Sequence, residues 1–153
     1  MSLEHSYSIY IKASPEQVWE ALTTPSFTTR YFPGGAVKSD WQEGSDYTMN
    51  SADGAKVLYD GRVVVSHRLR RLVQTVNIKF DPSVIGHEEM TIEWDIERFG
   101  ETCLLTIIHR GADSVANQFG MLTSHCPDLM SGIKTLLETG QPLQIGERVE
   151  AGV

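Results

Sequence analysis

The stretch at residues 7–22, YSIYIKASPEQVWEAL, changes from a strand pattern to a helix pattern within a few positions. The residues Tyr7, Ile9 and Ile11 alternate with Ser8, Tyr10 and Lys12. This alternation is typical of a strand with one buried face. The following residues place apolar side chains three and four positions apart, which is typical of a helix. The stretch therefore predicts a strand over 7–12 that leads directly into a helix.

The helix carries its own start signals. Ser14 can cap its N-terminus, Pro15 suits the first helical position, and Gln17 can complete a capping box with Ser14. Pro25 ends this helix and can begin a second short one over 26–31. Two short helices are therefore expected after the first strand.

From residue 36 onward the sequence is typical of strands joined by turns, and Asp53-Gly54 is a strong hairpin signal. In the clearest strand, Ile92, Trp94 and Ile96 share one face, whereas Glu93 and Asp95 lie on the opposite face and are expected in solvent. The candidate strands are 36–41, 46–50, 55–65, 72–80, 88–98 and 102–109. Short connections between neighbouring strands predict antiparallel pairing.

The last third of the chain returns to a helical period. Leu129, Ile133, Leu136 and Leu137 fall at i, i+4, i+7 and i+8, and Gly140 can end the helix that they define. A helix with such a stripe must bury it against the sheet. The pattern of residues 114–123 is compatible with either a helix or a loop.

This order predicts an α+β protein in which a curved antiparallel sheet of about six strands wraps a long C-terminal helix. The length of 153 residues suits one domain over 1–153, with its core at about 6–143 and a polar tail at 144–153. A curved sheet that grips one helix leaves space between the two, and such a space can hold a ligand.

Several motifs, in this order and spacing, resemble the START-like superfamily, also called the SRPBCC or Bet v 1-like group. One branch is similar in its ending, its middle segment and its last hairpin: the family named for the C-terminal domain of the activator of the heat-shock protein 90 ATPase. The motifs are the opening 8–22, Arg71-Leu72-Val73 after a strand with Gly61, Gly100-Glu101-Thr102, and the ending 132–140. The resemblance spans roughly residues 6–143.

The resemblance implies a helix-grip fold with two short helices between the first and second strands. The branch usually carries a Gly-Trp pair just before the C-terminal helix, whereas this chain has His125-Cys126-Pro127 there. The family name suggests a chaperone as a partner, although the chain offers no companion domain to grip one. Some relatives in the superfamily act on polyketide-type substrates through acid–base residues in their cavity.

Composition excludes several classes of protein. Hydrophobic residues make up 41% of the chain and no apolar run is long enough to cross a membrane. The 13 Lys+Arg against 20 Asp+Glu give a net charge of −7, which argues against nucleic acid and an anionic membrane surface as partners. Cys103 and Cys126 cannot form a disulfide framework or a zinc ribbon. With no secretory signal at the N-terminus, we expect a cytoplasmic protein.

Large apolar side chains supply the candidate binding site. Aromatic residues and methionine can line a hydrophobic cavity, and methionine adapts to irregular ligands. His109 ends the last strand, from which it could reach the cavity mouth and form a hydrogen bond to a ligand. The candidate lining residues are Trp41, Tyr59, Phe80, Trp94, His109, Met130 and Ile133.

Motifs for catalysis, metals and cofactors are weak. The five histidines are His5, His67, His87, His109 and His125, and none is spaced to share a metal with another on one helix. The chain has no glycine-rich phosphate loop and no nucleophile motif. Arg62 and Arg110 could pair with an anionic ligand or with surface carboxylates. We therefore expect no catalytic residue, no metal and no cofactor.

Three functions remain open. The leading hypothesis is non-catalytic binding of a small, hydrophobic or amphipathic molecule between the sheet and the C-terminal helix. The first alternative is a chaperone-associated module, and the second is a cavity enzyme of the polyketide cyclase type that uses His109, Tyr59 and Asp60. Exposed sheet edges or the N-terminal helices could also support a homodimer.

Overall fold

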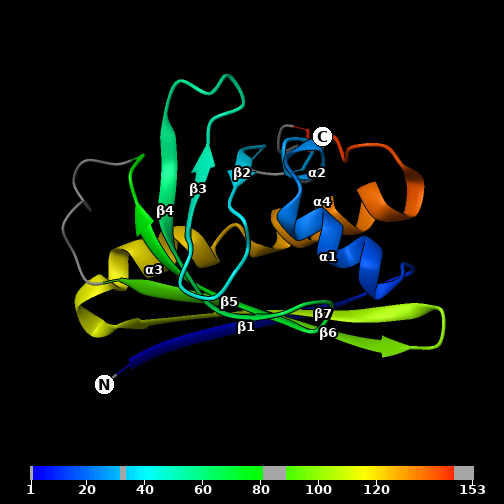
Figure 1. Cartoon of the computed structure of the whole chain (residues 1–153), viewed down its shortest axis with the longest axis horizontal. Helices are drawn as coiled ribbons and strands as arrows, with labels where there is room; N and C mark the ends of the chain where they lie inside the picture. The colour runs from blue at the N-terminus through cyan, green and yellow to red at the C-terminus, as the bar shows by residue number, and fades with distance from the viewer. Residues whose placement is uncertain (1, 32–33, 81–88, 147–153) are drawn as a thin grey trace, which may run out of the picture.

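A computed structural model describes residues 2–31, 34–80 and 89–146, and it shows an α+β architecture (Figure 1). The strands form one antiparallel sheet in the order β1-β7-β6-β5-β4-β3-β2. They are β1 Ser2–Ile11, β2 Ala36–Lys38, β3 Asp46–Asn50, β4 Val57–His67, β5 Arg71–Ile78, β6 Met90–Phe99 and β7 Thr102–Ala112. The described sheet thus has seven strands, one more than the expected total of about six, and they correspond to the predicted first strand and the six candidate strands after it.

Helices precede and follow the sheet strands as predicted. They are α1 Pro15–Thr23, α2 Pro25–Thr28, the short 3-10 helix η2 Asp113–Val115, α3 Ala116–Thr123 and α4 Cys126–Thr139. The predicted capping box of α1 is confirmed: the amide of Gln17 donates to Ser14 Oγ at 3.2 Å, and the amide of Ser14 donates to Gln17 Oε1 at 2.9 Å. Residues 114–123, whose sequence is compatible with a helix or a loop, are helical: they lie in η2 and α3.

The first strand begins five residues earlier than predicted, at Ser2 rather than Tyr7. It pairs with β7 along its whole length, so that Leu3 lies opposite Gly111 and His5 lies opposite His109. Leu3 and His5 continue the half-buried face of the strand. A histidine in this position hides the period, because it does not count as an apolar residue in a sequence pattern.

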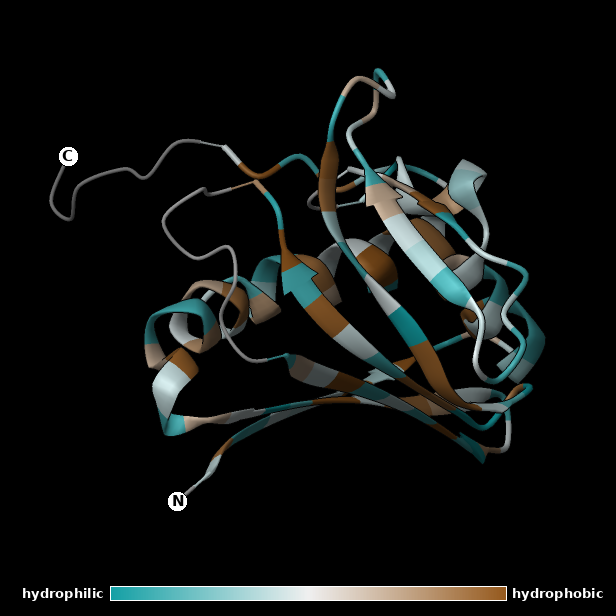
Figure 2. Ribbon diagram, turned by 60° about the vertical axis from the view of Figure 1, so that its left-hand side comes forward, coloured by the Kyte–Doolittle hydropathy of each residue, from teal (hydrophilic) through white to brown (hydrophobic). Residues whose placement is uncertain are grey.

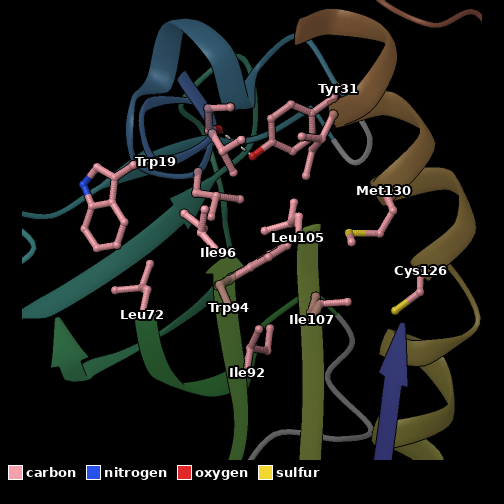
Figure 3. Packing of buried hydrophobic residues seen from close by; sticks show 14 of the residues in the cluster. Trp19, Tyr31, Leu72, Ile92, Trp94, Ile96, Leu105, Ile107, Cys126 and Met130 are labelled. Atoms are coloured by element: carbon pink, nitrogen blue, oxygen red, sulfur yellow. Dashed lines mark hydrogen bonds between the residues drawn. The ribbon is translucent and has the colours of Figure 1, made fainter. Parts of the chain in front are cut away.

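Helix α4 lies along the concave side of the sheet, and apolar residues alternate with polar ones along the strands (Figures 1 and 2). Its residues Met130, Ile133 and Leu136 are buried. Figure 3 shows Met130 and Cys126 pointing from α4 toward Leu105 and Ile107 of β7. The predicted arrangement, a curved antiparallel sheet around a long C-terminal helix, is confirmed.

Candidate functional site

A pocket of about 450 Å³ lies between the sheet and the helices. Helices α1 to α4 and strands β2 to β7 all contribute to its wall. Its apolar wall consists of Leu22, Tyr31, Val37, Trp41, Met49, Leu58, Tyr59, Phe80, Ile92, Trp94, Met121, Leu122 and Leu129. Its polar wall consists of Thr28, Gln74, His109 and His125. The volume is within the range of about 300–1,000 Å³ that small-molecule sites have.

Five of the seven candidate lining residues border this pocket: Trp41, Tyr59, Phe80, Trp94 and His109. Met130 and Ile133 do not border it and are fully buried in the hydrophobic core. The reason is their place along α4. The pocket meets this helix only at its start, through His125 and Leu129, and beyond that point the core fills the space between helix and sheet.

Trp41 occupies a strained position that fixes one side of the pocket. Its φ of 59° is unusual for a residue other than glycine. Two hydrogen bonds hold it: the indole Nε1 donates to the carbonyl of Thr23 at 3.0 Å, and the backbone amide donates to Ser39 Oγ at 3.0 Å. The ring also stacks on Tyr47, with centroids 6.3 Å apart. The expected strand over 36–41 therefore ends at Lys38, before this turn.

Burial keeps three ionisable groups of the pocket wall, Tyr31, Tyr59 and His109, uncharged near neutral pH. It raises the pKa of Tyr59 to about 12 and also raises the pKa of Tyr31. Burial, helped by the neighbouring His5, lowers the pKa of His109 to about 4. The lining residues in the described part of the chain include no Asp, Glu, Lys or Arg. The pocket is therefore suited to a neutral ligand.

The arginines that could have met an anionic ligand pair with carboxylates instead. Arg62 Nη2 lies 3.3 Å from Glu89 Oε1. Arg110 Nη1 lies 2.8 Å from Glu93 Oε1, and its Nε lies 3.2 Å from Glu4 Oε2. Neither arginine borders the pocket, and neither does Asp60, the carboxylate of the enzyme hypothesis. Pairing with carboxylates is the interpretation of these arginines that the structure bears out, although one of the carboxylates, Glu93, is buried rather than on the surface.

His109 also has a neighbour that the sequence did not suggest. Its Nδ1 lies 3.8 Å from Cys126 Sγ, and its ring centroid lies 6.2 Å from that of His5. Burial raises the pKa of the Cys126 thiol to about 11, so that it stays protonated at neutral pH. This pair is therefore not an activated nucleophile of the cysteine–histidine type. His87 and the tail residues 147–153 lie outside the described residues.

Sequence reasoning missed several pocket residues. Tyr31 follows α2 and donates its hydroxyl to the carbonyl of Ala21 at 2.8 Å, which turns its ring into the interior. Gln74 is a polar residue buried in the middle of β5. Met121 and Leu122 come from α3, whose helical pattern is weakened by Gly120. The alternation along β5 was a signal for Gln74, since it shares the inward face of Leu72 and Val76.

Solved structures of similar fold cover most of the chain. CalU16 from Micromonospora echinospora is 17% identical, with a TM-score of 0.71, over 93% of this chain and 78% of that one. DynU16 of the dynemicin biosynthetic locus is 21% identical, with a TM-score of 0.73, over 91% of this chain and 48% of that one. The Aha1 dimer from Colwellia psychrerythraea is 17% identical, with a TM-score of 0.70, over 90% and 98%. These likenesses concern the fold.

A comparison with curated protein sequences gives no match. No helix in the described part of the chain is long and apolar enough to span a membrane. The sequence model of the family described as "Activator of Hsp90 ATPase homolog 1-like protein" matches residues 12–137, which is most of the chain. The resemblance that the sequence motifs indicated is thereby confirmed, and the chain belongs to the activator of Hsp90 ATPase homolog 1-like family.

Proposed function

We propose that this protein binds a small, neutral and largely apolar molecule in the pocket between the sheet and the helices. The observation that carries the proposal is the chemistry of the wall, in which aromatic and aliphatic side chains surround a few polar groups and no Asp, Glu, Lys or Arg is found among the described lining residues. Burying apolar ligand surface against such a wall is favourable by roughly 25 cal/mol per Å². A charged ligand would lose its hydration there without meeting a counter-charge.

The polar groups give the ligand an orientation. The Tyr59 hydroxyl, the Gln74 amide and the neutral His109 ring can each donate or accept a hydrogen bond. Trp41, Phe80 and Trp94 offer flat apolar surfaces for the rest of the molecule. A ligand with one or two hydrogen-bonding groups on an aromatic or alicyclic body fits this division.

A fluorescent neutral probe, N-phenyl-1-naphthylamine, tests the proposal. We expect one probe to bind per chain and to raise the melting temperature, because a ligand that binds only the folded state stabilises it by about 2.7 kcal/mol at a concentration of 100 times Kd. The variant Leu122→Trp places a large side chain on the pocket wall and should lose binding. Val64→Trp, at an exposed position of β4 outside the pocket, is the matched control.

Two results would contradict the proposal. One is a wild-type chain whose melting temperature does not change at saturating probe. The other is equal probe binding by Leu122→Trp and Val64→Trp when both are folded, since this would place the probe elsewhere on the surface.

The family description favours a chaperone-associated role as the second candidate function. This role would use an exposed surface and would not need the pocket. Co-purification with the Hsp90-type chaperone of the same organism at physiological salt, unchanged in Leu122→Trp, would favour it. Loss of pocket binding in the same variant separates the two functions.

A further inference from the structure

Three metal-binding side chains converge where β1, β7 and α4 meet. His5 and His109 are directly opposite each other in the β1–β7 ladder, and Cys126 is the first residue of α4. Their ligating nitrogen and sulfur atoms all lie within 4.8 Å of one another. His5 and His109 are 104 positions apart in the sequence, and Cys126 follows His109 by 17 positions. Only the fold brings them together.

The packing of this cluster leaves one polar atom without a hydrogen bond. The Nδ1 atom of His5 is buried and has no hydrogen-bond partner among the described residues. An unpaired buried nitrogen costs about 1–3 kcal/mol, so such atoms are rare unless they meet something else. The two imidazole rings are tilted by 55°, so stacking does not account for their approach. A cation bound through this nitrogen would give it a partner.

We propose that His5, His109 and Cys126 bind one zinc-class transition metal ion. Imidazole nitrogen and thiolate sulfur are the ligands that zinc prefers, whereas magnesium and calcium require oxygen. Tetrahedral zinc places such ligand atoms about 3.3–3.6 Å apart, given Zn–N and Zn–S bonds of about 2.0–2.3 Å. The His109 Nδ1 to Cys126 Sγ distance is already 3.8 Å. The other two pairs lie within 4.8 Å, so the ligand atoms have to approach one another by no more than about 1.5 Å.

Binding forms two nitrogen–metal bonds and one sulfur–metal bond, and the thiol proton of Cys126 leaves to solvent without any change of oxidation state. Three protein ligands leave a fourth position of the tetrahedron for water or another small group. His109 also borders the pocket, so the ion and the proposed binding site would share this residue. The metal proposal does not depend on the pocket proposal, because it concerns binding of the ion alone.

Cobalt(II) is the probe for the test, since cobalt–thiolate bonds absorb in the near ultraviolet. We expect the reduced full-length chain to bind one Co²⁺ with this absorption, and Zn²⁺ to displace it. Cys126→Ser should remove the band. Cys103→Ser should retain it, because Cys103 is the other buried cysteine and is not part of the cluster.

His5→Gln provides a second variant that tolerates substitution, since His5 is only half-buried and lies near the start of β1. Its loss should weaken Zn²⁺ binding by more than about tenfold, as losing a ligand costs more than losing an outer partner. The exposed His67→Gln is its control.

The proposal is overturned if the wild-type chain shows no cobalt–thiolate band. It is also overturned if the band survives in Cys126→Ser, disappears in Cys103→Ser, or is equally strong in His5→Gln and His67→Gln at limiting metal. Far-ultraviolet circular dichroism checks that each variant is folded. If Cys126→Ser does not fold, the comparison of the two histidine variants decides.

Discussion

Glu93 is buried on the face of β6 opposite Trp94, because two arginines cover it. Arg110 Nη1 and Arg71 Nη2 lie 2.8 and 3.1 Å from Glu93 Oε1, and the carboxylate side chain is only 8% exposed. Burial would raise the pKa of Glu93, but hydrogen bonds with Asp95 and Arg110 and the charge of Arg71 hold it below its usual value. Glu93 therefore remains ionised at neutral pH beside a second carboxylate.

That second carboxylate, Asp95, is the group whose ionised form is destabilised by this arrangement. Its pKa is raised from 3.8 to about 6, first by burial and then by the hydrogen bond and charge of Glu93. Since the folded-state pKa exceeds the unfolded one, the folded state binds more protons between about pH 4 and 6, and this contribution to stability is lost as the pH rises through 6. We expect Asp95→Asn to raise the melting temperature at pH 8 and to have little effect at pH 4.

Glu97→Gln is the matched control, since it removes the same charge from an exposed position two residues along the strand. Thermal unfolding of the three proteins between pH 4 and 8 gives the comparison. An Asp95→Asn gain that is equal at both ends of this range, or that Glu97→Gln reproduces, would show that the raised pKa of Asp95 is not its source.

At the residue scale, the alternation of apolar and polar residues predicts on which face of a strand a side chain lies better than it predicts whether that side chain is buried. Ile92, Trp94 and Ile96 point inward as the sequence indicates, and Glu93 lies on the opposite face. The prediction that Glu93 is in solvent is wrong, because the arginine that covers it from β7 is distant in sequence. His5 joined the candidate residues only through the β1–β7 register. No local pattern contains either contact.

At the scale of the elements, the packing of β4 against β5 requires a glycine at position 61. Gly61 packs directly on β5, and a Cβ atom at this position would overlap the carbonyl oxygen of Thr75 and lie 2.6 Å from its Oγ1. Thr75 is fixed, since its carbonyl accepts the hydroxyl of Tyr47 and its Oγ1 accepts the amide of Arg62 at 2.8 Å. The backbone here cannot move away without breaking these bonds.

Gly61→Ala should therefore destabilise the protein by about 3 kcal/mol or more, at the upper end of the usual cost of overpacking. Gly120→Ala is the control, because no atom lies within 4 Å of a Cβ atom built there and the position is helical. Alanine should stabilise α3 by about 0.5–1 kcal/mol. Urea unfolding measures both. A Gly61→Ala variant as stable as the wild type would mean that β4 and β5 separate easily.

The elements that the sequence predicts best are those with local signals. The start of α1 follows from Ser14 and Gln17, and the end of α4 follows from Gly140, whose φ is 77°. The start of β1 and the end of α2 do not follow, because pairing with β7 extends β1 and because α2 ends at Thr28 rather than at residue 31. Long-range pairing thus decides what local propensity leaves open.

At the scale of the whole molecule, the pocket borders two parts of the protein: the main hydrophobic core, and a thin part that consists of strands β2 and β3. The main hydrophobic core includes buried residues of β1, β5, β6, β7, α1 and α4. Strands β2 and β3 have buried residues of their own, Val37, Tyr47 and Met49, but these lie outside that core. The pocket contacts Val37 and Met49 on one side and Ile92 and Trp94 on the other. We therefore expect the thin part to open more easily than the main core and, if the proposed ligand binds, to admit it.

Amide hydrogen exchange tests this division. Without ligand, the hydrogen-bonded amides of β3 should exchange faster than those of β6 and β7, because opening the thin part leaves the main core intact. N-phenyl-1-naphthylamine at 100 times Kd should slow the β3 amides by about a hundredfold if their opening releases the probe. The same addition to Leu122→Trp should leave them unchanged. Rapid β3 exchange that the bound probe does not slow would show that β2 and β3 open without exposing the pocket, and the entry route would then have to lie between the helices.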